Sequence, residues 1–146
     1  MMNILVINGP NLSQLGKRDK NQYGSFTLDD LMEKMIKNFP EVSFEFFQSN
    51  YEGAIIDELE KYEDYDGIII NPGAFTHYSY AIRDCIESIP KIIIEVHISN
   101  VYNREDFRKT SVISPVCTGK ISGLKDYSYI LAVEYIVNNL IGGKND

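Results

Sequence analysis

The 146-residue chain contains little cysteine and little histidine. Its two cysteines, Cys85 and Cys117, lie far apart and show neither a CxxC spacing nor a metal-ligand spacing. We therefore expect two free thiols and a reduced, cytoplasmic protein. With only two histidines and no carboxylates clustered with them in a metal-binding motif, a zinc or di-metal site is not expected.

Excess positive charge and long apolar runs are also missing. The formal net charge of -7 at pH 7 opposes nucleic-acid binding and favours solubility. No apolar stretch approaches the roughly 20 residues that a membrane helix needs. The N-terminal apolar run is too short for a secretory signal and has no basic leader. The sequence thus predicts a protein that binds neither nucleic acid nor membrane.

The first apolar run, residues 4–7, is not followed by a nucleotide-binding motif. It ends in Asn8-Gly9-Pro10-Asn11, which matches neither GxGxxG nor GxxxxGK[ST]. The acidic cluster of a phosphoacceptor domain and the Ser/Thr-rich phosphate loop of a flavin protein are missing there as well. We therefore predict no bound cofactor.

Apolar runs alternate with amphipathic stretches along the whole chain. The expected strands cover residues 4–7, 42–47, 68–70, the stretch 92–100 with its apolar start, and 120–124. The expected helices cover 28–39, 52–61, 76–88 and 127–141. This alternation predicts a doubly wound parallel α/β sheet with helices on both faces. Five strands favour the flavodoxin-like strand order 2-1-3-4-5, in one domain spanning residues 1–146.

Two details of the connections are informative. Thr27 and Asp30 resemble a capping box, and Thr76 could cap the third helix. The irregular segment around residues 16–26 is long for a connection inside a compact α/β domain. Because it carries Arg18 and Tyr23, we predict that it is a lid.

Polar clusters follow three of the strands, at residues 8–11, 71–77 and 95–100. In the strand order 2-1-3-4-5, strands 1, 3 and 4 are neighbours, so these clusters meet at one edge of the sheet. Ligands of open α/β sheets bind at this edge, which predicts a crevice for a small ligand. A strand that simply ends in water remains the alternative for any one cluster.

The cluster after the fourth strand suggests acid catalysis. Glu95 and His97 are two residues apart and share one face of an extended strand. A carboxylate that accepts a hydrogen bond from the imidazole favours its protonated form, which makes His97 a candidate general acid. Ile98 and Ser99 follow at the turn, where backbone N–H groups can bind a carboxylate.

The lid suggests a base. A phenol is a poor base near neutral pH unless a cation stabilises the phenolate, and Arg18 lies close to Tyr23 in the sequence. A packing role for Tyr23 remains open, since the chain has ten tyrosines.

Taken together, these motifs resemble the type II 3-dehydroquinate dehydratases. The resemblance spans nearly the whole chain and rests on motifs at residues 8–12, 15–18, 23–24, 48–50, 70–77, 83–84, 95–100 and 104–108. It implies a dehydration of 3-dehydroquinate to 3-dehydroshikimate in the shikimate or quinate pathway, without metal or Schiff base. The implied reaction is an anti elimination that passes through an enolate.

The resemblance also implies roles for the catalytic residues. Tyr23 matches the base, and Arg18 matches the residue that activates it as a tyrosinate. His97 matches the acid that protonates the leaving hydroxyl, and Glu95 matches the residue that orients it. Asn11 matches a residue that helps to hold the enolate through a bound water.

A further set of residues matches substrate-binding positions: Asn71, His77, Asp84, Ile98, Ser99 and Arg108. Among them, Ile98 and Ser99 match the backbone that binds the carboxylate, and Arg108 matches a ligand of a substrate hydroxyl. Asp84 matches a residue contributed across a subunit contact, because the family assembles trimers into dodecamers.

The chain departs from the family pattern at Lys20, Tyr51 and Asn103, and residues 123–127 lack the expected glycine pair. None of these departures touches the proposed catalytic set. Two alternatives remain: a non-catalytic flavodoxin-like module that binds a small anion or a partner, and a flavin or nucleotide protein.

Overall fold

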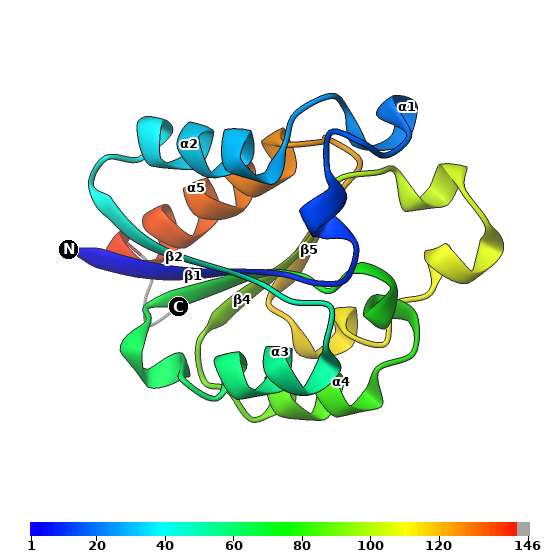
Figure 1. The fold of residues 1–146 in the computed structure, drawn as a ribbon. Helices are drawn as coiled ribbons and strands as arrows, with labels where there is room; N and C mark the ends of the chain where they lie inside the picture. The colour runs from blue at the N-terminus through cyan, green and yellow to red at the C-terminus, as the bar shows by residue number, and fades with distance from the viewer. Residues whose placement is uncertain (143–146) are drawn as a thin grey trace.

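The computed structural model describes residues 1–142 and contains one five-stranded sheet with helices on both faces (Figure 1). The strands are β1 (Met2–Asn8), β2 (Val42–Gln48), β3 (Gly67–Asn71), β4 (Ile92–His97) and β5 (Gly119–Ser122). Their order is β2-β1-β3-β4-β5, and all neighbouring pairs are parallel. The predicted fold class and strand order are therefore confirmed. The last four residues of the predicted 1–146 domain lie outside the described residues.

Within the described residues, five α-helices connect or follow the strands. They are α1 (Lys20–Tyr23), α2 (Leu28–Asn38), α3 (Glu52–Leu59), α4 (Tyr80–Glu87) and α5 (Tyr127–Gly142). Short 3-10 turns cover Leu12–Gln14, Tyr62–Asp64, Gly73–His77, Val101–Asn103, Asp106–Lys109 and Ser114–Val116. Within residues 1–142, no helix is both long and apolar enough to cross a membrane.

The sheet is buried on both faces, as continuous apolar strands require. Successive side chains of a strand point to opposite faces. Ile4 of β1 accordingly packs with α2 and α5, whereas Leu5 packs with α3 and α4. Two apolar layers thus fix the sheet and leave its carboxyl edge for polar side chains.

The start of α2 is the capping box that the sequence predicts. The Asp30 backbone N–H donates to the Thr27 hydroxyl at 3.1 Å, and the Thr27 N–H donates to the Asp30 carboxylate at 3.0 Å. Aspartate therefore replaces the more usual Glu or Gln without loss of either bond.

The predicted start of the third helix is wrong. Residues Gly73–His77 form a 3-10 turn, so α4 begins only at Tyr80, with Ser79 as its N-cap. The Ser79 hydroxyl accepts from the Ile82 N–H at 3.1 Å and donates to Glu52 at 2.5 Å. Thr76 is instead buried inside the turn, and its hydroxyl has no hydrogen-bond partner among the described residues.

The ends of β1 and β3 approach each other closely. Asn8 pairs with Asn71 in the sheet, and the Gly9 N–H donates to the Asn71 carbonyl at 2.8 Å. A Cβ atom on Gly9 would lie 2.5 Å from the Pro72 carbonyl oxygen, so only glycine fits this position. This contact brings two of the three predicted polar clusters to one point.

Candidate active site

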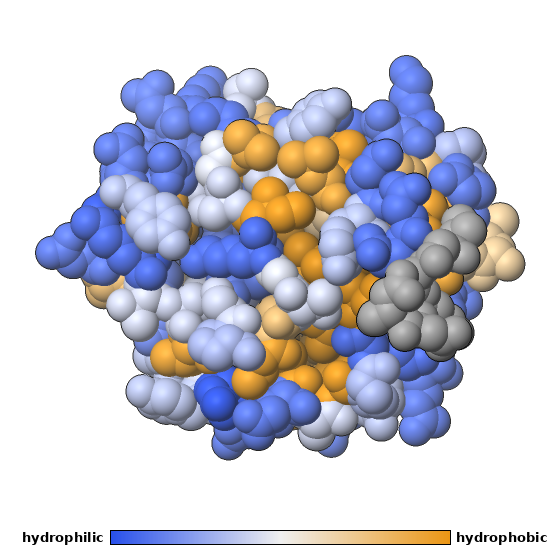
Figure 2. Space-filling model, turned by 180° about the vertical axis from the view of Figure 1, so that it is seen from behind, coloured by the Kyte–Doolittle hydropathy of each residue, from blue (hydrophilic) through white to orange (hydrophobic). Residues whose placement is uncertain are grey.

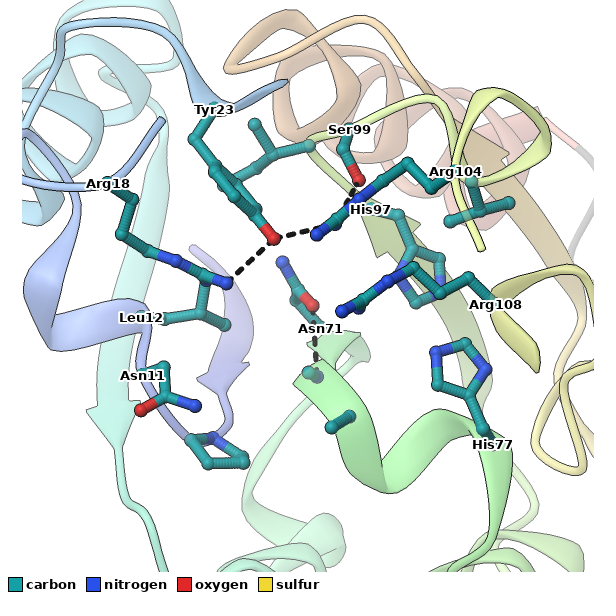
Figure 3. Close-up of a pocket in the computed structure, with 15 residues that line it drawn as sticks. Asn11, Leu12, Arg18, Tyr23, Asn71, His77, His97, Ser99, Arg104 and Arg108 are labelled. Atoms are coloured by element: carbon teal, nitrogen blue, oxygen red, sulfur yellow. Dashed lines mark hydrogen bonds between the residues drawn. The ribbon is translucent and has the colours of Figure 1, made fainter. Parts of the chain in front are cut away.

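A pocket with a cavity volume of about 110 Å³ lies at the carboxyl edge of the sheet (Figure 3). The ends of β1, β3 and β4 form its floor, and the lid and the segment after β4 supply the remaining walls. Nine of the eleven predicted site residues line it: Asn11, Arg18, Tyr23, Asn71, His77, His97, Ile98, Ser99 and Arg108. The structure thus brings together residues that are up to 97 positions apart (11 to 108).

Tyr23 lies between two guanidinium groups, as Figure 3 shows. Arg18 Nη2 donates to Tyr23 Oη at 2.7 Å, and Arg104 Nη1 donates to the same oxygen at 2.6 Å. The Arg18 guanidinium carbon also lies 3.7 Å from the centre of the tyrosine ring. Two cationic donors therefore place positive charge at the one oxygen on which a negative charge would form if the phenol lost its hydrogen. Tyr23 is only 7% exposed, so water does little to screen these contacts.

Sequence reasoning gave Arg104 no role. It lies within the 104–108 motif and also donates to the Ser99 hydroxyl at 3.1 Å. Its contact with Tyr23 joins residues that are 81 positions apart. Two sequence signals could have pointed to Arg104: its place in the 104–108 motif, and its position in an irregular segment that follows a strand with site residues.

The predicted lid is not wholly irregular, because it contains the single-turn helix α1. The Asp19 carboxylate caps α1 by accepting from the Asn21 N–H at 2.9 Å. Gly16 and Gly24 flank the lid with positive φ angles of 94° and 78°, which glycine adopts most easily. Short helical order between two such glycines holds Tyr23 over the pocket.

The loop that lacks the expected glycine pair still adopts a glycine-like conformation. Lys125 has φ = 54°, in the left-handed region that side chains with a Cβ rarely occupy. Its Nζ donates to the Asn21 carbonyl at 3.2 Å. Its side chain also packs close to Gly24, since a Cβ atom added to Gly24 would lie 3.4 Å from Lys125 Cδ. Lys125 therefore links the loop before α5, residues 123–126, to the lid.

Glu95 and His97 form a buried pair behind the pocket. His97 Nε2 lies 2.5 Å from Glu95 Oε2 and carries the hydrogen, because a carboxylate only accepts. The hydroxyls of Ser111 and Ser114 also donate to Glu95, at 3.1 Å and 2.6 Å, and Lys120 Nζ lies 3.9 Å away. This leaves Nδ1 as the ring nitrogen available to a ligand.

The carboxylate of Glu95 is charged despite its complete burial. Burial alone would raise its pKa, but the hydrogen bond and charge of His97, the Ser114 hydroxyl and Lys120 outweigh it and lower the pKa below 4.5. An anionic Glu95 fixes the orientation of the imidazole and places a negative charge beside it.

His77 is a second histidine in the pocket, with a different environment. Burial lowers the pKa of His77 below 6.5, and the positive charges of His97 and Arg108 lower it further. Its Nδ1 lies 2.7 Å from the Thr110 carbonyl, so Nδ1 carries the hydrogen and Nε2 is an acceptor. The two histidines are thus suited to opposite tasks.

Three arginines make the pocket positive within an acidic protein. Burial lowers the pKa of Arg18 from its ordinary value, and the charges of Arg104 and Arg108 act in the same direction. The guanidinium group of arginine is positively charged at neutral pH. Arg108 is held by Glu105, whose Oε1 accepts from its Nε at 3.1 Å. Such a cluster suits an anionic ligand.

Two predicted residues do not line the pocket. Glu95 lies directly behind His97, which is consistent with an orienting role. Asp84 lies on the outer face of α4 with 73% of its side chain exposed, and it pairs with Arg83 at 3.1 Å. Asp84 therefore contributes nothing to the pocket of its own chain.

The described residues include no group of three or more His, Cys, Asp and Glu side chains that could hold a metal ion. Cys85 and Cys117 are both free thiols, as predicted. Burial raises the pKa of Cys117 to about 12, with a smaller contribution from the charge of Glu95. A thiol of this kind is unreactive near neutral pH.

Comparisons with known proteins point to one family. A family profile described as Dehydroquinase class II matches residues 2–137. The 3-dehydroquinate dehydratase of Thermotoga neapolitana is 58% identical over 138 residues, which cover 92% of this chain and 94% of that protein.

Solved structures agree with this relationship. The type II dehydroquinase of Butyrivibrio crossotus has a TM-score of 0.90 and 49% identity, covering 93% of this chain and 97% of its own. The type II dehydroquinase of Propionibacterium acnes has a TM-score of 0.91 and 38% identity, covering 94% and 97%.

Proposed function

Since the chain belongs to the class II dehydroquinase family, we propose that it is a 3-dehydroquinate dehydratase, a hydro-lyase that converts 3-dehydroquinate to 3-dehydroshikimate. The observation that carries the proposal is one pocket with two groups of opposed character. Tyr23 is placed between two guanidinium groups, and His97 is paired with a buried carboxylate. Opposed protonation states of this kind mark a base and an acid.

Tyr23 acts as the base. Its phenolate removes a proton from the carbon next to the substrate ketone, and the electron pair of that C–H bond forms an enolate. Arg18 and Arg104 make this possible by stabilising the phenolate before the proton moves. A preorganised charge of this type requires little rearrangement during the reaction.

Asn11 helps to hold the enolate oxygen, through a bound water as the family resemblance implies. Its backbone is held in the left-handed region, at φ = 71°, a conformation that asparagine tolerates better than most residues. The Asn11 N–H donates to the Asn50 side chain at 3.1 Å, which fixes the loop. Its own side chain lines the pocket and is available for this contact.

His97 acts as the acid. Its Nδ1 donates a proton to the hydroxyl beta to the ketone, and the enolate electrons expel that group as water. Glu95 orients the ring through Nε2 and stabilises the imidazolium. The elimination has anti geometry by resemblance to the family.

The remaining pocket residues bind the substrate. Its carboxylate is held by the backbone of Ile98 and Ser99, and Arg108, Asn71 and His77 contact its oxygens. The positive charge of the pocket supports this arrangement, because the substrate is an anion.

The protein assembles as trimers that form a dodecamer, with Asp84 at a subunit contact. Tyr80 and Asp84 are four residues apart on α4, so they share one face, and both are exposed. Figure 2 shows apolar side chains gathered across the middle of the face opposite that of Figure 1. Apolar areas of this kind suit contacts between protein chains. Size-exclusion chromatography with light scattering tests the assembly, and a monomer would contradict it.

The two free thiols suit a reducing compartment, and we place the enzyme in the cytoplasm. No cofactor takes part in the proposed reaction.

The activity is tested by adding 3-dehydroquinate to the purified protein and following absorbance in the near ultraviolet, where the enone carboxylate product absorbs. We expect turnover that neither EDTA nor borohydride inhibits. If the substrate binds but no absorbance develops, the chain is an anion-binding module instead. A coloured, flavin-containing preparation would favour the flavin alternative.

A further inference from the structure

Three buried side chains behind the pocket form a continuous hydrogen-bonded chain. Tyr129 of α5 donates from its hydroxyl to Asn8 Oδ1 at 2.5 Å, and Asn71 Nδ2 donates to the Tyr129 hydroxyl oxygen at 3.0 Å. The exposed fractions are 2% for Asn8, 3% for Asn71 and zero for Tyr129. Of the three, only Asn71 lines the pocket.

A backbone group sets the direction of this chain. The Gly73 N–H donates to Asn71 Oδ1 at 3.1 Å, and a backbone N–H can only donate. The amide oxygen of Asn71 must therefore face Gly73, and its nitrogen must face Tyr129. Burial raises the pKa of Tyr129 well above 10, so its hydroxyl keeps its hydrogen and passes it to Asn8.

This arrangement leaves Asn71 with one polar group for a ligand. Its oxygen is used by Gly73 and one amide hydrogen by Tyr129, so the second amide hydrogen remains. In Figure 3 the amide nitrogen of Asn71 faces the Tyr23 side of the pocket, and a dashed line marks the hydrogen bond that its oxygen accepts from the Gly73 N–H. A ligand atom beside it must be a hydrogen-bond acceptor.

We propose that Tyr129 is a positioning residue that holds Asn71 as an obligatory hydrogen-bond donor to an oxygen of the substrate. The proposal rests on the proposed function, which supplies the oxygen-rich substrate. Tyr129 never touches the substrate and acts only through the Asn71 amide. Without its hydroxyl, the amide keeps a single anchor at Gly73 and can rotate about its Cβ–Cγ bond.

The ring of Tyr129 has a separate, structural task. It packs in the apolar cluster between the sheet and α5, and phenylalanine would preserve that packing. Tyr129→Phe therefore removes one oxygen atom and leaves the ring in place. A matched control is Tyr65→Phe, which deletes a half-buried tyrosine hydroxyl in the other apolar layer.

The test compares KM and kcat of the wild type, Tyr129→Phe, Asn71→Ala and the double variant, at a temperature where thermal scans show each to be folded. We expect Tyr129→Phe to raise KM for 3-dehydroquinate about tenfold with kcat within about twofold, and Tyr65→Phe to change neither. In the Asn71→Ala background, Tyr129→Phe should add nothing to KM.

Two results would overturn the proposal. One is an unchanged KM in Tyr129→Phe, and the other is a KM in the double variant that rises by the product of the two single-variant factors. An inactive wild type would instead refute the proposed function and is recognised separately. If Tyr129→Phe does not fold, Asn8→Ala takes its place, because it removes the acceptor of the Tyr129 hydroxyl. KM and kcat are then compared for Asn8→Ala, Asn71→Ala and their double variant, with the same criteria.

Discussion

Replacing Arg104 with methionine removes one of the two guanidinium groups that donate to Tyr23 Oη, and keeps a side chain of similar length. The lost contacts are a 2.6 Å charge-assisted hydrogen bond to Tyr23 Oη and a 3.1 Å hydrogen bond to the Ser99 hydroxyl, whereas the 2.7 Å bond from Arg18 to Tyr23 remains. A hydrogen bond to a charged group contributes roughly 1.5–3 kcal/mol. The phenolate of Tyr23 should be less stable by about that amount in Arg104→Met.

The expected result is a fall in kcat/KM of roughly 10- to 150-fold near neutral pH, since about 1.4 kcal/mol corresponds to a factor of ten. The assay is the initial rate of enone formation across a series of 3-dehydroquinate concentrations, which gives kcat and KM separately.

A matched control separates this local effect from the general loss of a positive charge. Lys109 lies in the same segment, forms an ion pair with Asp106 at 3.2 Å and does not line the pocket. Lys109→Met should keep the wild-type kcat/KM. The reasoning is refuted if Arg104→Met keeps the wild-type kcat/KM, or if Lys109→Met shows the same loss.

Other predictions concern acid stability, substrate binding and the lid. The lowered pKa of Glu95 adds to the free energy of unfolding of the wild type above pH 4.5, and this contribution is lost as pH falls through the pKa of the folded state. In urea unfolding, the difference in free energy of unfolding between the wild type and Glu95→Gln should therefore shrink below pH 4.5. A difference that stays constant with pH would contradict this. Arg108→Met should raise KM about tenfold in steady-state kinetics, because one charged contact to the anionic substrate is lost. An unchanged KM would argue against a role of Arg108 in substrate binding. Lys125→Met keeps the apolar stem but cannot donate to Asn21, so trypsin should cut the lid at Lys17 and Arg18 about twice as fast. Equal cutting rates would mean that Lys125 does not hold the lid.

Much of the fold could be predicted because it depends on local patterns. Continuous apolar runs such as residues 68–70 mark strands buried on both faces, and the alternation of strands and helices restricts the topology. The site followed from the same logic, since the carboxyl ends of neighbouring parallel strands must meet. Glu95 and His97 could be paired from their spacing alone.

Other features depend on contacts that no local pattern records. Arg104 reaches Tyr23 across 81 positions, and Tyr129 reaches Asn71 across 58. Neither contact follows from periodicity. The misplaced cap at Thr76 has a similar cause, because the turn after Pro72 uses five residues in a 3-10 conformation before the helix starts at Tyr80.

The central claim is that Tyr23 is the base and His97 the acid, and a hydrogen-exchange experiment tests it most directly. In D2O, NMR can follow the loss of the substrate hydrogen next to the ketone independently of dehydration. His97→Gln, which places an amide nitrogen near the position of Nε2, should still exchange this hydrogen but should not expel water. Tyr23→Phe should do neither. Exchange at the wild-type rate in Tyr23→Phe, or its loss in folded His97→Gln, would contradict the assignment.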